Sequence, residues 1–447
     1  MRGPSPNQDQ GNLFFTPLKE LLNPAHRLYQ LSAEIDWSVF ESEFGKHYSH
    51  TGRPSHPVRL MVGLLILKQL DNLGDETVVE KWVENPYYQY FCGMDVFQWN
   101  FPIDPSDLVY FRNRIGRAGA ELILQSSVQI HGKEAEESEI SVDTTVQSKA
   151  ITFPTDAKLH KRIMEYCWAI ADQEGIKLRQ SYKRKIKNYL RSQYNSQHPK
   201  RRKAARKGLR KIRTITGRLV RDVVRKLPED RLANYAELLA IFHKVMTQKR
   251  GDSDKVYAIH APEVSCIAKG KAYPKYEFGA KAAIAQTKKG GIIVAAESFQ
   301  GNPHDSYTLL PILLQYHRIL DALPEAAILD RGFRGVNSIF GVKMIRPDKP
   351  KNNNTPYQKR KARKRFRRRA AIEPAIGHLK HRFRLHRNWL KGSKGDQFNL
   401  LMAAAAFNFK KWINKVPEKL VFLLFQTSPA LWYKRLDKMT LTLSERQ

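Results

Sequence analysis

The pattern of apolar and polar residues predicts a helical region in the first third of the chain. Apolar residues recur at helical spacing in three stretches, which cover residues 57–73, 75–91 and 102–116. Gly74 ends the first predicted helix, Asp75 can cap the second, and Gly116 ends the third. Residues 1–55 show no sustained period and are expected to form an irregular arm with one short helix.

These three helices, joined by tight turns, are compatible with two arrangements. They can form a helix-turn-helix-like unit that reads DNA. They can equally form a plain helical bundle, because the apolar stripe has the same spacing in both cases. Periodicity does not separate the two interpretations, so both remain open for this region.

The period changes at residues 139–150, where Ile140 and Val142 alternate with polar residues as in a β-strand. An amphipathic helix started by Asp305 is expected at residues 305–320, and a long basic helix at about residues 356–390. Further strands are predicted at residues 255–261, 276–287, 290–300, 325–330 and 341–347. The predicted order is therefore strand, helical insertion, three strands, helix, two strands and helix.

The helical insertion, residues 156–249, is unusual in its charge. Within it, residues 182–227 carry basic side chains almost unrelieved by acid. Such a charge density repels itself unless phosphates neutralise it. A merely solvated helical face usually mixes both signs, so contact with a polyanion is the favoured interpretation.

The composition of the whole chain supports a polyanionic partner. In 447 residues, 77 lysines and arginines face 43 acids, which gives a formal net charge of +34. Charge alone leaves DNA, ribosome-like binding and membrane surfaces open. The length predicts two or three domains, and 42% hydrophobic residues can supply their cores.

Membrane insertion and disulfide bonding are not expected. The longest apolar stretches, 58–70 and 400–409, are shorter than the roughly 20 residues that cross a bilayer. The N-terminal residues are polar and show no secretory signal. Cys92, Cys167 and Cys266 lack metal-binding spacing and are interpreted as buried, reduced thiols of a cytosolic protein.

Three acidic residues occupy positions that suit a catalytic site. Asp143 lies inside a predicted buried strand, where an uncompensated carboxylate is expensive and needs a cation. Asp330 ends another apolar strand, at the edge where open α/β sheets place binding residues. Glu373 is the lone acid of a helix crowded with bases. His304 and Asp305 are interpreted as a helix start and not as an acid/base pair.

The helix of Glu373 presents one chemically mixed face. At 100° per residue, four side chains fall within a band of roughly 60°: Phe366, Arg369, Glu373 and Lys380. Three carboxylates from two strands and a helix suit two magnesium ions about 4 Å apart, because hard cations prefer oxygen ligands. Arg369 and Lys380 would then grip phosphates beside the scissile bond.

At these residues the sequence resembles the DDE transposases of bacterial insertion sequences. The stretches "SVDTTVQSKA" and "AILDRGFRG" and the spacing from Phe366 to Lys380 are similar to the insertion sequence 5 group, within the wider set that carries the YREK signature. Residues 56–93 look like the N-terminal domain of that group, and residues 395–412 look like its closing segment.

The resemblance implies a fold, a reaction and partners. The fold is α/β, with a ribonuclease-H-like mixed sheet, an all-helical N-terminal domain and a basic helical insertion after the first strand. The implied activity is metal-dependent cleavage and transfer of DNA strands, with Mg²⁺ or Mn²⁺, by a homo-oligomer on double-stranded DNA that comprises the transposon ends and the target. A protein of this kind is expected in the bacterial cytoplasm, on the nucleoid.

Carried over by position, Asp143, Asp330 and Glu373 match the catalytic acids and metal ligands, and Arg369 and Lys380 match the basic DNA-binding pair. Phe366 stands where the signature has tyrosine, so it keeps a stacking surface and loses the hydroxyl. The expected division is an N-terminal arm, a helical DNA-binding domain, a catalytic core in two pieces, the basic insertion and a tail, at residues 1–55, 56–136, 137–155 with 250–412, 156–249 and 413–447.

Three functions remain distinct at this stage. The first is a transposase that binds the terminal inverted repeats of its element, cuts there and joins the freed 3′-hydroxyls to target DNA. The second keeps the fold and acts only as a metal-dependent nuclease. The third is a catalytically idle nucleic-acid-binding protein. Because all three acids and the basic pair are present, the transposase is favoured.

Overall fold

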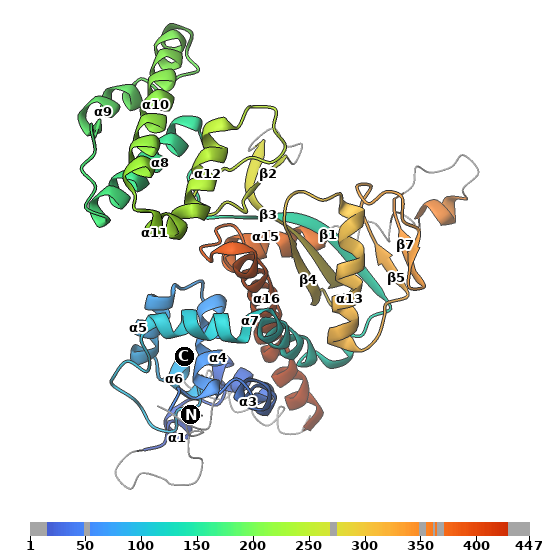
Figure 1. Cartoon of the computed structure of the whole chain (residues 1–447). Helices are drawn as coiled ribbons and strands as arrows, with labels where there is room; N and C mark the ends of the chain where they lie inside the picture. Colours follow the sequence, from blue (N-terminus) through green and yellow to red (C-terminus); the bar gives the residue numbers. More distant parts are fainter. Residues whose placement is uncertain are drawn as a thin grey trace, which may run out of the picture.

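The computed structural model describes residues 16–48, 54–268, 275–347, 355–360, 363 and 371–427, with side chains in the last range described as far as residue 415. A helical N-terminal region, a mixed β-sheet and a helical insertion that stands away from the sheet make up the molecule (Figure 1). None of the helices in the described part of the chain is long and apolar enough to cross a membrane.

The N-terminal region is built around one largely apolar helix. Its helices are α1 (Leu18–Leu21), α2 (Arg27–Glu34), α3 (Trp37–Gly45), α4 (Val58–Leu70), α5 (Asp75–Glu84), α6 (Pro86–Phe91) and α7 (Pro105–Gln129). Nearly every residue of α4 is buried, because α3, α5, α7 and the C-terminal helix α16 (Gly392–Thr427) contact it. A helix that is apolar all round belongs in a core, and α4 occupies that position.

The predicted number of helices is wrong at two places in the N-terminal region. The described part of the arm holds three helices, not one, because Leu31 and Phe40 are fully buried in the same core as α4. The second predicted helix is two helices, because Asn85 leaves helical geometry before Pro86 and its side chain caps α6.

Asp75 does not cap α5 as predicted, since the capping position is Gly74. Its carboxylate instead accepts hydrogen bonds from Arg112 on α7, at 2.7 and 2.8 Å, and from Lys68 on α4, at 2.6 Å. Burial alone would raise the pKa of Asp75, but Arg112 and Lys68 lower it below its ordinary value. Burial also lowers the pKa of Lys68, to about 8. This buried ion triad ties α4, α5 and α7 together.

The sheet combines an antiparallel half with a parallel half. Its strands are β1 (Glu139–Ser148), β2 (Ser265–Ala268), β3 (Tyr276–Thr287), β4 (Ile293–Phe299), β5 (Ala326–Ile328), β6 (Ser338–Ile339) and β7 (Val342–Ile345). The order is β2-β3-β1-β5-β7-β6, with β4 also paired to β3. Strand β1 is antiparallel to β3 and parallel to β5, which is in turn parallel to β7.

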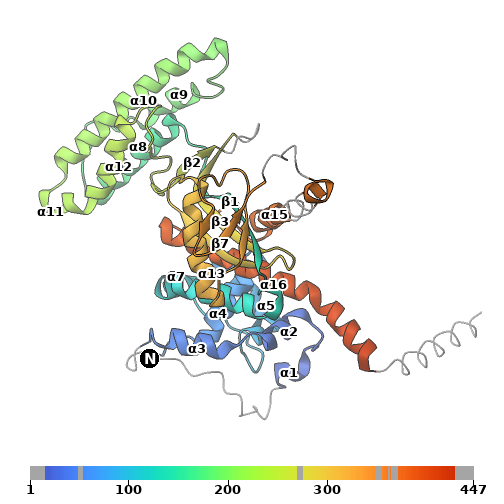
Figure 2. The same ribbon diagram turned by 90° about the vertical axis from the view of Figure 1, so that its right-hand side faces the viewer.

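Helices cover the sheet and connect it to the N-terminal region. Helix α13 (Leu309–Leu320) packs against β4, and α16 contacts both β4 and α7 (Figure 2). An antiparallel meander of β1, β3 and β4, followed by a helix and two parallel strands, is the ribonuclease-H-like arrangement. The predicted fold class, a mixed α/β sheet with a helical N-terminal region, is confirmed.

Strand predictions failed at one place. Residues 255–261 form turns and no strand, although Val256, Ala258 and Ile259 are buried. Val256 and Ile259 join the hydrophobic core of the insertion, and Ala258 joins a small separate cluster, so these apolar residues are buried without forming a ladder. The first strand after the insertion is β2 instead, and it pairs with the start of β3.

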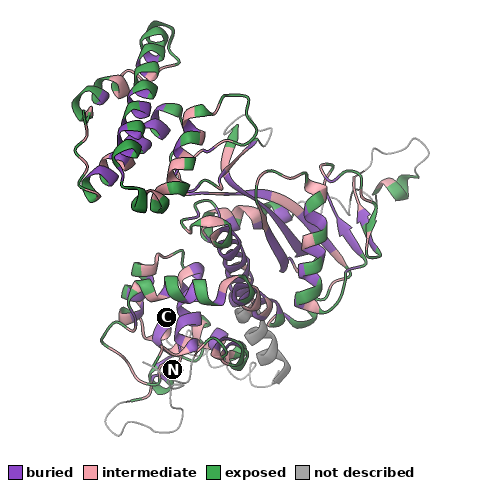
Figure 3. Cartoon of the chain, in the orientation of Figure 1, coloured by how far each residue is buried: buried purple, intermediate pink, exposed green. Residues whose placement is uncertain are grey.

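The insertion has its own hydrophobic core, separate from the main one. It contains α8 (Asp156–Gln173), α9 (Lys183–Arg191), α10 (Pro199–Lys226), α11 (Glu229–Leu232) and α12 (Ala236–Thr247). Ile163, Ile212, Val223 and Phe242 are completely buried at its centre. Buried and exposed residues alternate along α10 (Figure 3), so this helix has one packed face and one face in solvent.

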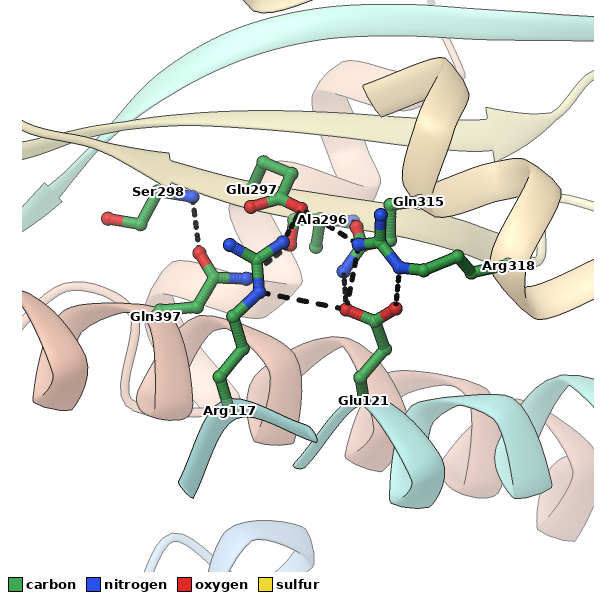
Figure 4. Close-up of polar contacts among 8 residues, drawn as sticks. All are labelled: Arg117, Glu121, Ala296, Glu297, Ser298, Gln315, Arg318 and Gln397. Atoms are coloured by element: carbon green, nitrogen blue, oxygen red, sulfur yellow. Dashed lines mark hydrogen bonds and ion pairs between the residues drawn. The ribbon is translucent and has the colours of Figure 1, made fainter. Parts of the chain in front are cut away.

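Helix α7 continues past Gly116, where the prediction ended it. Gly116 adopts φ 55° and ψ −149°, a conformation that costs glycine little, and helical geometry then resumes as far as Gln129. The kink brings Arg117 and Glu121 against the sheet. Figure 4 shows them beside Glu297 of β4, Gln315 and Arg318 of α13, and Gln397 of α16.

Glu297 is the buried centre of this network. Arg117 donates to its carboxylate, and Arg318 lies 3.6 Å from the same oxygen. Arg318 also donates to Glu121 at 2.6 Å. Burial raises the pKa of Glu297 to about 7, although the two arginines oppose the shift. Between pH 4.5 and 7 the unfolded carboxyl is therefore ionised while the folded one still holds its proton.

Replacement of Glu297 with glutamine is expected to remove a pH dependence of stability. A raised pKa favours the folded state fully below the unfolded value of 4.5, and this contribution fades as pH rises through 7. The change corresponds to roughly 3 kcal/mol. Thermal unfolding of parent and Glu297→Gln between about pH 5 and pH 8 measures it. We expect the unfolding temperature of Glu297→Gln to rise relative to that of the parent as the pH rises. A difference between the two unfolding temperatures that stays constant with pH would contradict the raised pKa of Glu297.

Candidate active site

The sheet places Asp143 on β1 and brings Asp330 just beyond the end of the neighbouring parallel strand β5. Strands β1 and β5 pair in the register Glu139 with Ala326 and Ser141 with Ile328. Asp143 lies two residues beyond Ser141, and Asp330 lies two residues beyond Ile328. Adjacent strands are about 4.8 Å apart. Both acids therefore stand at the same level, toward the end of the sheet where the parallel strands finish.

Backbone amides orient the two carboxylates. The Thr144 N–H donates to Asp143 Oδ1 at 2.8 Å, and the Gly332 N–H donates to Asp330 Oδ1 at 2.7 Å. Both side chains are partly exposed, so solvent or a ligand can reach them. A partly exposed carboxylate that a backbone amide orients is suited to bind a cation.

A third acid, Asp305, turns toward the same place. Thr144 Oγ1 donates to Asp305 Oδ1 at 2.9 Å, and Lys281 Nζ lies 2.6 Å from that oxygen. A Cβ on Gly332 would lie 2.7 Å from Asp305 Oδ2 and 2.9 Å from Asp330 Oδ1. Two carboxylates thus converge on Gly332, and only a residue without a side chain fits between them.

The prediction that Asp305 caps its helix is wrong. A short 3₁₀ turn, η3 (Asp305–Thr308), precedes α13, and His304 Nδ1 accepts from the Ser306 N–H in the capping position. Asp305 is instead paired with Lys281 from β3. Lys281 is buried and also donates to the Pro303 carbonyl at 2.5 Å. A lone lysine in the apolar stretch "GAKAAIA" was the available signal, because a buried ammonium needs a carboxylate.

Glu373 comes from a separate element. It lies in the first turn of α15 (Ile372–Arg382), a helix that buries Ile372, Ala375 and Leu379 and contacts β1. The Glu373 side chain itself is exposed. The predicted long helix across residues 356–390 ends at Arg382, because Arg384 takes a left-handed conformation with φ 62°.

The predicted DNA-binding residues are only partly described. Phe366 and Arg369 lie outside the described residues. Lys380 is on α15, and its Nζ contacts the two carboxylate oxygens of Glu277 on β3 at 3.1 and 3.4 Å. A phosphate would therefore have to replace Glu277 as the partner of this ammonium.

The carboxylate chemistry fits a hard divalent cation, but the ligands are not assembled. Oxygen ligands are those that Mg²⁺ and Mn²⁺ prefer. Among the described residues, no three His, Cys, Asp or Glu side chains form a group that could hold a metal ion. The structure brings Asp143 and Asp330 to adjacent strands, and it does not bring Glu373 into one metal-binding group with them. The assignment of the three ligands stays a prediction.

Comparison with known proteins matches two parts of the chain to transposase families. Residues 16–114 match a family described as "Transposase domain (DUF772)". Residues 244–409, which contain Asp330 and Glu373, match the family described as "Transposase DDE domain". The chain belongs to the DDE transposases. Asp143 lies between the two matched segments, on the strand that precedes the insertion of this transposase.

One relative of this transposase comes from Rhizobium meliloti. It is named "Uncharacterized protein ORF8 in nfe locus" and is 44% identical over 192 residues. The alignment covers 42% of the present chain and 93% of that protein. No solved structure matches the chain.

Proposed function

We propose that this transposase binds the terminal inverted repeats of its element, cuts DNA there and joins the 3′-ends to target DNA. Within the family we place it in the insertion sequence 5 group, with Arg369, Glu373 and Lys380 as its signature residues. The observation that supports this proposal most is that Asp143 on β1 and Asp330 just after β5 each lie two residues beyond the paired residues Ser141 and Ile328 of these parallel strands.

In this proposal Asp143, Asp330 and Glu373 hold two Mg²⁺ or Mn²⁺ ions. When bound, such ions activate a water or a 3′-hydroxyl and neutralise charge on the departing oxygen. The Thr144 and Gly332 amides keep the two aspartates oriented. For phosphoryl transfer a protein mainly has to position the reacting groups and neutralise charge.

The remaining parts of the mechanism concern DNA and movement. Glu373 has to join the two aspartates in one group when DNA and metal bind, because no such group of three ligands exists among the described residues. Lys380 then exchanges Glu277 for a phosphate, while Arg369 and Phe366 contact the flanking nucleotides. Two ends are held together by a homo-oligomer. The expected domain division makes residues 56–136 a DNA-binding domain, and reading of the repeat ends falls either to residues 56–116 or to the basic run 182–227.

A strand-transfer assay tests the proposal. Protein, Mg²⁺ and a supercoiled target are mixed with DNA ends that are either embedded in flanking sequence or already cut to expose a 3′-hydroxyl. We expect joined products with the pre-cut ends, and none when the 3′-hydroxyl is replaced by hydrogen. Degradation without joining would favour the metal-dependent nuclease. Binding without either product would overturn both enzymatic functions.

A further inference from the structure

Helix α10 carries a row of cations on its solvent face. We define the α10 cation row as Lys203, Arg206, Lys207, Arg210 and Lys211, all of which are exposed. Their spacing of three and four residues places them on one side of the helix. We propose that this row binds the phosphate backbone of duplex DNA while the transposase holds its substrate. The inference rests on the proposed function, because it concerns how the same DNA is gripped.

The buried face of α10 keeps the cation row, on the opposite face, in solvent. Ile212, Ile215 and Leu219 are buried in the core of the insertion, where α10 packs on α8, and Ala205 is also buried. Gly208 allows α9 to approach so closely that a Cβ there would lie 2.2 Å from Ser192 Oγ. The helix cannot rotate without breaking this packing, so the cations stay in solvent.

Acidic side chains of the insertion do not neutralise the α10 cation row. Residues 182–227 contain eighteen lysines and arginines and one acid, Asp222. That acid is buried and already accepts from the Arg179 N–H at 2.8 Å and from Arg225 at 2.8 Å, with Lys226 at 3.2 Å. Elsewhere in the insertion Arg213 pairs with Asp156 and Arg231 with Glu174. Among the described residues, no ion pair involves the row itself.

The dimensions of the row suit a DNA strand. Eight residue steps of an α-helix cover about 12 Å. Over that length one strand of duplex DNA presents roughly three or four phosphates. Five cations at this density repel one another when alone and are neutralised by such a strand. The charge of the row therefore complements a rigid, regularly charged polyanion.

The chemistry of the row indicates backbone contact without base reading. The row contains only lysine and arginine and offers no aromatic side chain on which unpaired bases could stack. One side of α10 is packed against the insertion, and the row on its exposed side presents cations of the kind that contact phosphates. Phosphates of double-stranded DNA are the partner that these features fit best.

The test compares two triple variants of the full chain. Lys203→Gln, Lys207→Gln and Arg210→Gln remove part of the row. Lys133→Gln, Lys289→Gln and Lys343→Gln remove the same charge from exposed lysines at the end of the sheet where β1 and β5 begin. Binding to a random-sequence DNA duplex is measured against KCl concentration, and thermal unfolding checks that both variants fold like the parent.

We expect the row variant to show a slope of log affinity against log salt that is shallower than the parent slope by about 2.7. The fall in affinity between 50 and 200 mM salt then becomes about 40-fold smaller. The control variant should keep the parent slope to within about one unit. A row variant with the slope of the parent would overturn the inference, as would an effect confined to an RNA duplex.

Failure of this inference and failure of the proposed function give different results. If the parent joins pre-cut ends while the row variant keeps the parent salt slope, the row does not bind DNA and the function stands. If the row variant shows a shallower salt slope than the parent while the parent joins no DNA ends, the row binds DNA and the strand-transfer function is excluded.

Discussion

Replacement of Asp330 with asparagine is expected to abolish strand cleavage and joining and to leave DNA binding intact. Asparagine keeps an oxygen that can accept from the Gly332 N–H, so the turn after β5 is preserved. It removes the negative charge that the proposed metal site requires. Loss of a charge on which the transition state depends should lower the rate at least about 10³-fold.

The matched control is Asp321→Asn. Asp321 caps α13 in a left-handed conformation with φ 50°, which asparagine also tolerates, and its side chain is exposed. This variant should keep parent activity in the strand-transfer assay. Joined products from Asp330→Asn at a rate close to that of the parent would exclude Asp330 from the chemistry, and loss of DNA binding would assign it a structural role.

Replacement of Asp75 with asparagine should destabilise the N-terminal region by about 3–5 kcal/mol. The substitution leaves Lys68 and Arg112, with side chains 12% and 8% exposed, as buried cations without a counter-charge. An unpaired buried charge costs far more than a surface ion pair gains. Urea unfolding of the parent and the variant, followed by far-ultraviolet circular dichroism, measures the difference.

Asp254→Asn is the control for that measurement. Asp254 pairs with Lys244 at 2.5 Å, but its side chain is 87% exposed. Loss of such a pair should change stability by less than about 1 kcal/mol. If Asp75→Asn were no more destabilising than Asp254→Asn, the buried triad would not hold α4, α5 and α7 together.

Local patterns were sufficient for elements with a strong period. The largely apolar 58–70 stretch predicted a core helix, and the alternation around Asp143 predicted a strand, because each pattern leaves one way to bury its apolar side chains. Residues 255–261 show the limit of this reasoning. Their side chains are buried by packing against neighbours far along the chain, without a strand ladder.

Polar residues were harder to place than apolar ones. Asp75 and Asp305 both precede helices, so each looked like a cap, yet each carboxylate pairs with a buried lysine from another element. A cap and a tertiary ion pair have the same local sequence, and only the folded chain decides between them. For the candidate site, the positions of Asp143 and Asp330 followed from strand patterning, whereas the approach of Asp305 and the paired state of Lys380 did not.

The most direct test of the account is Mn²⁺ binding to the protein with a pre-cut DNA end, measured by calorimetry. We predict two ions per active site, and strongly weakened binding in Asp143→Asn, Asp330→Asn and Glu373→Gln. Asp305→Asn should retain the ions, because Lys281 already neutralises that carboxylate. Unchanged binding in Glu373→Gln together with loss of binding in Asp305→Asn would contradict the account and make Asp305 the third ligand.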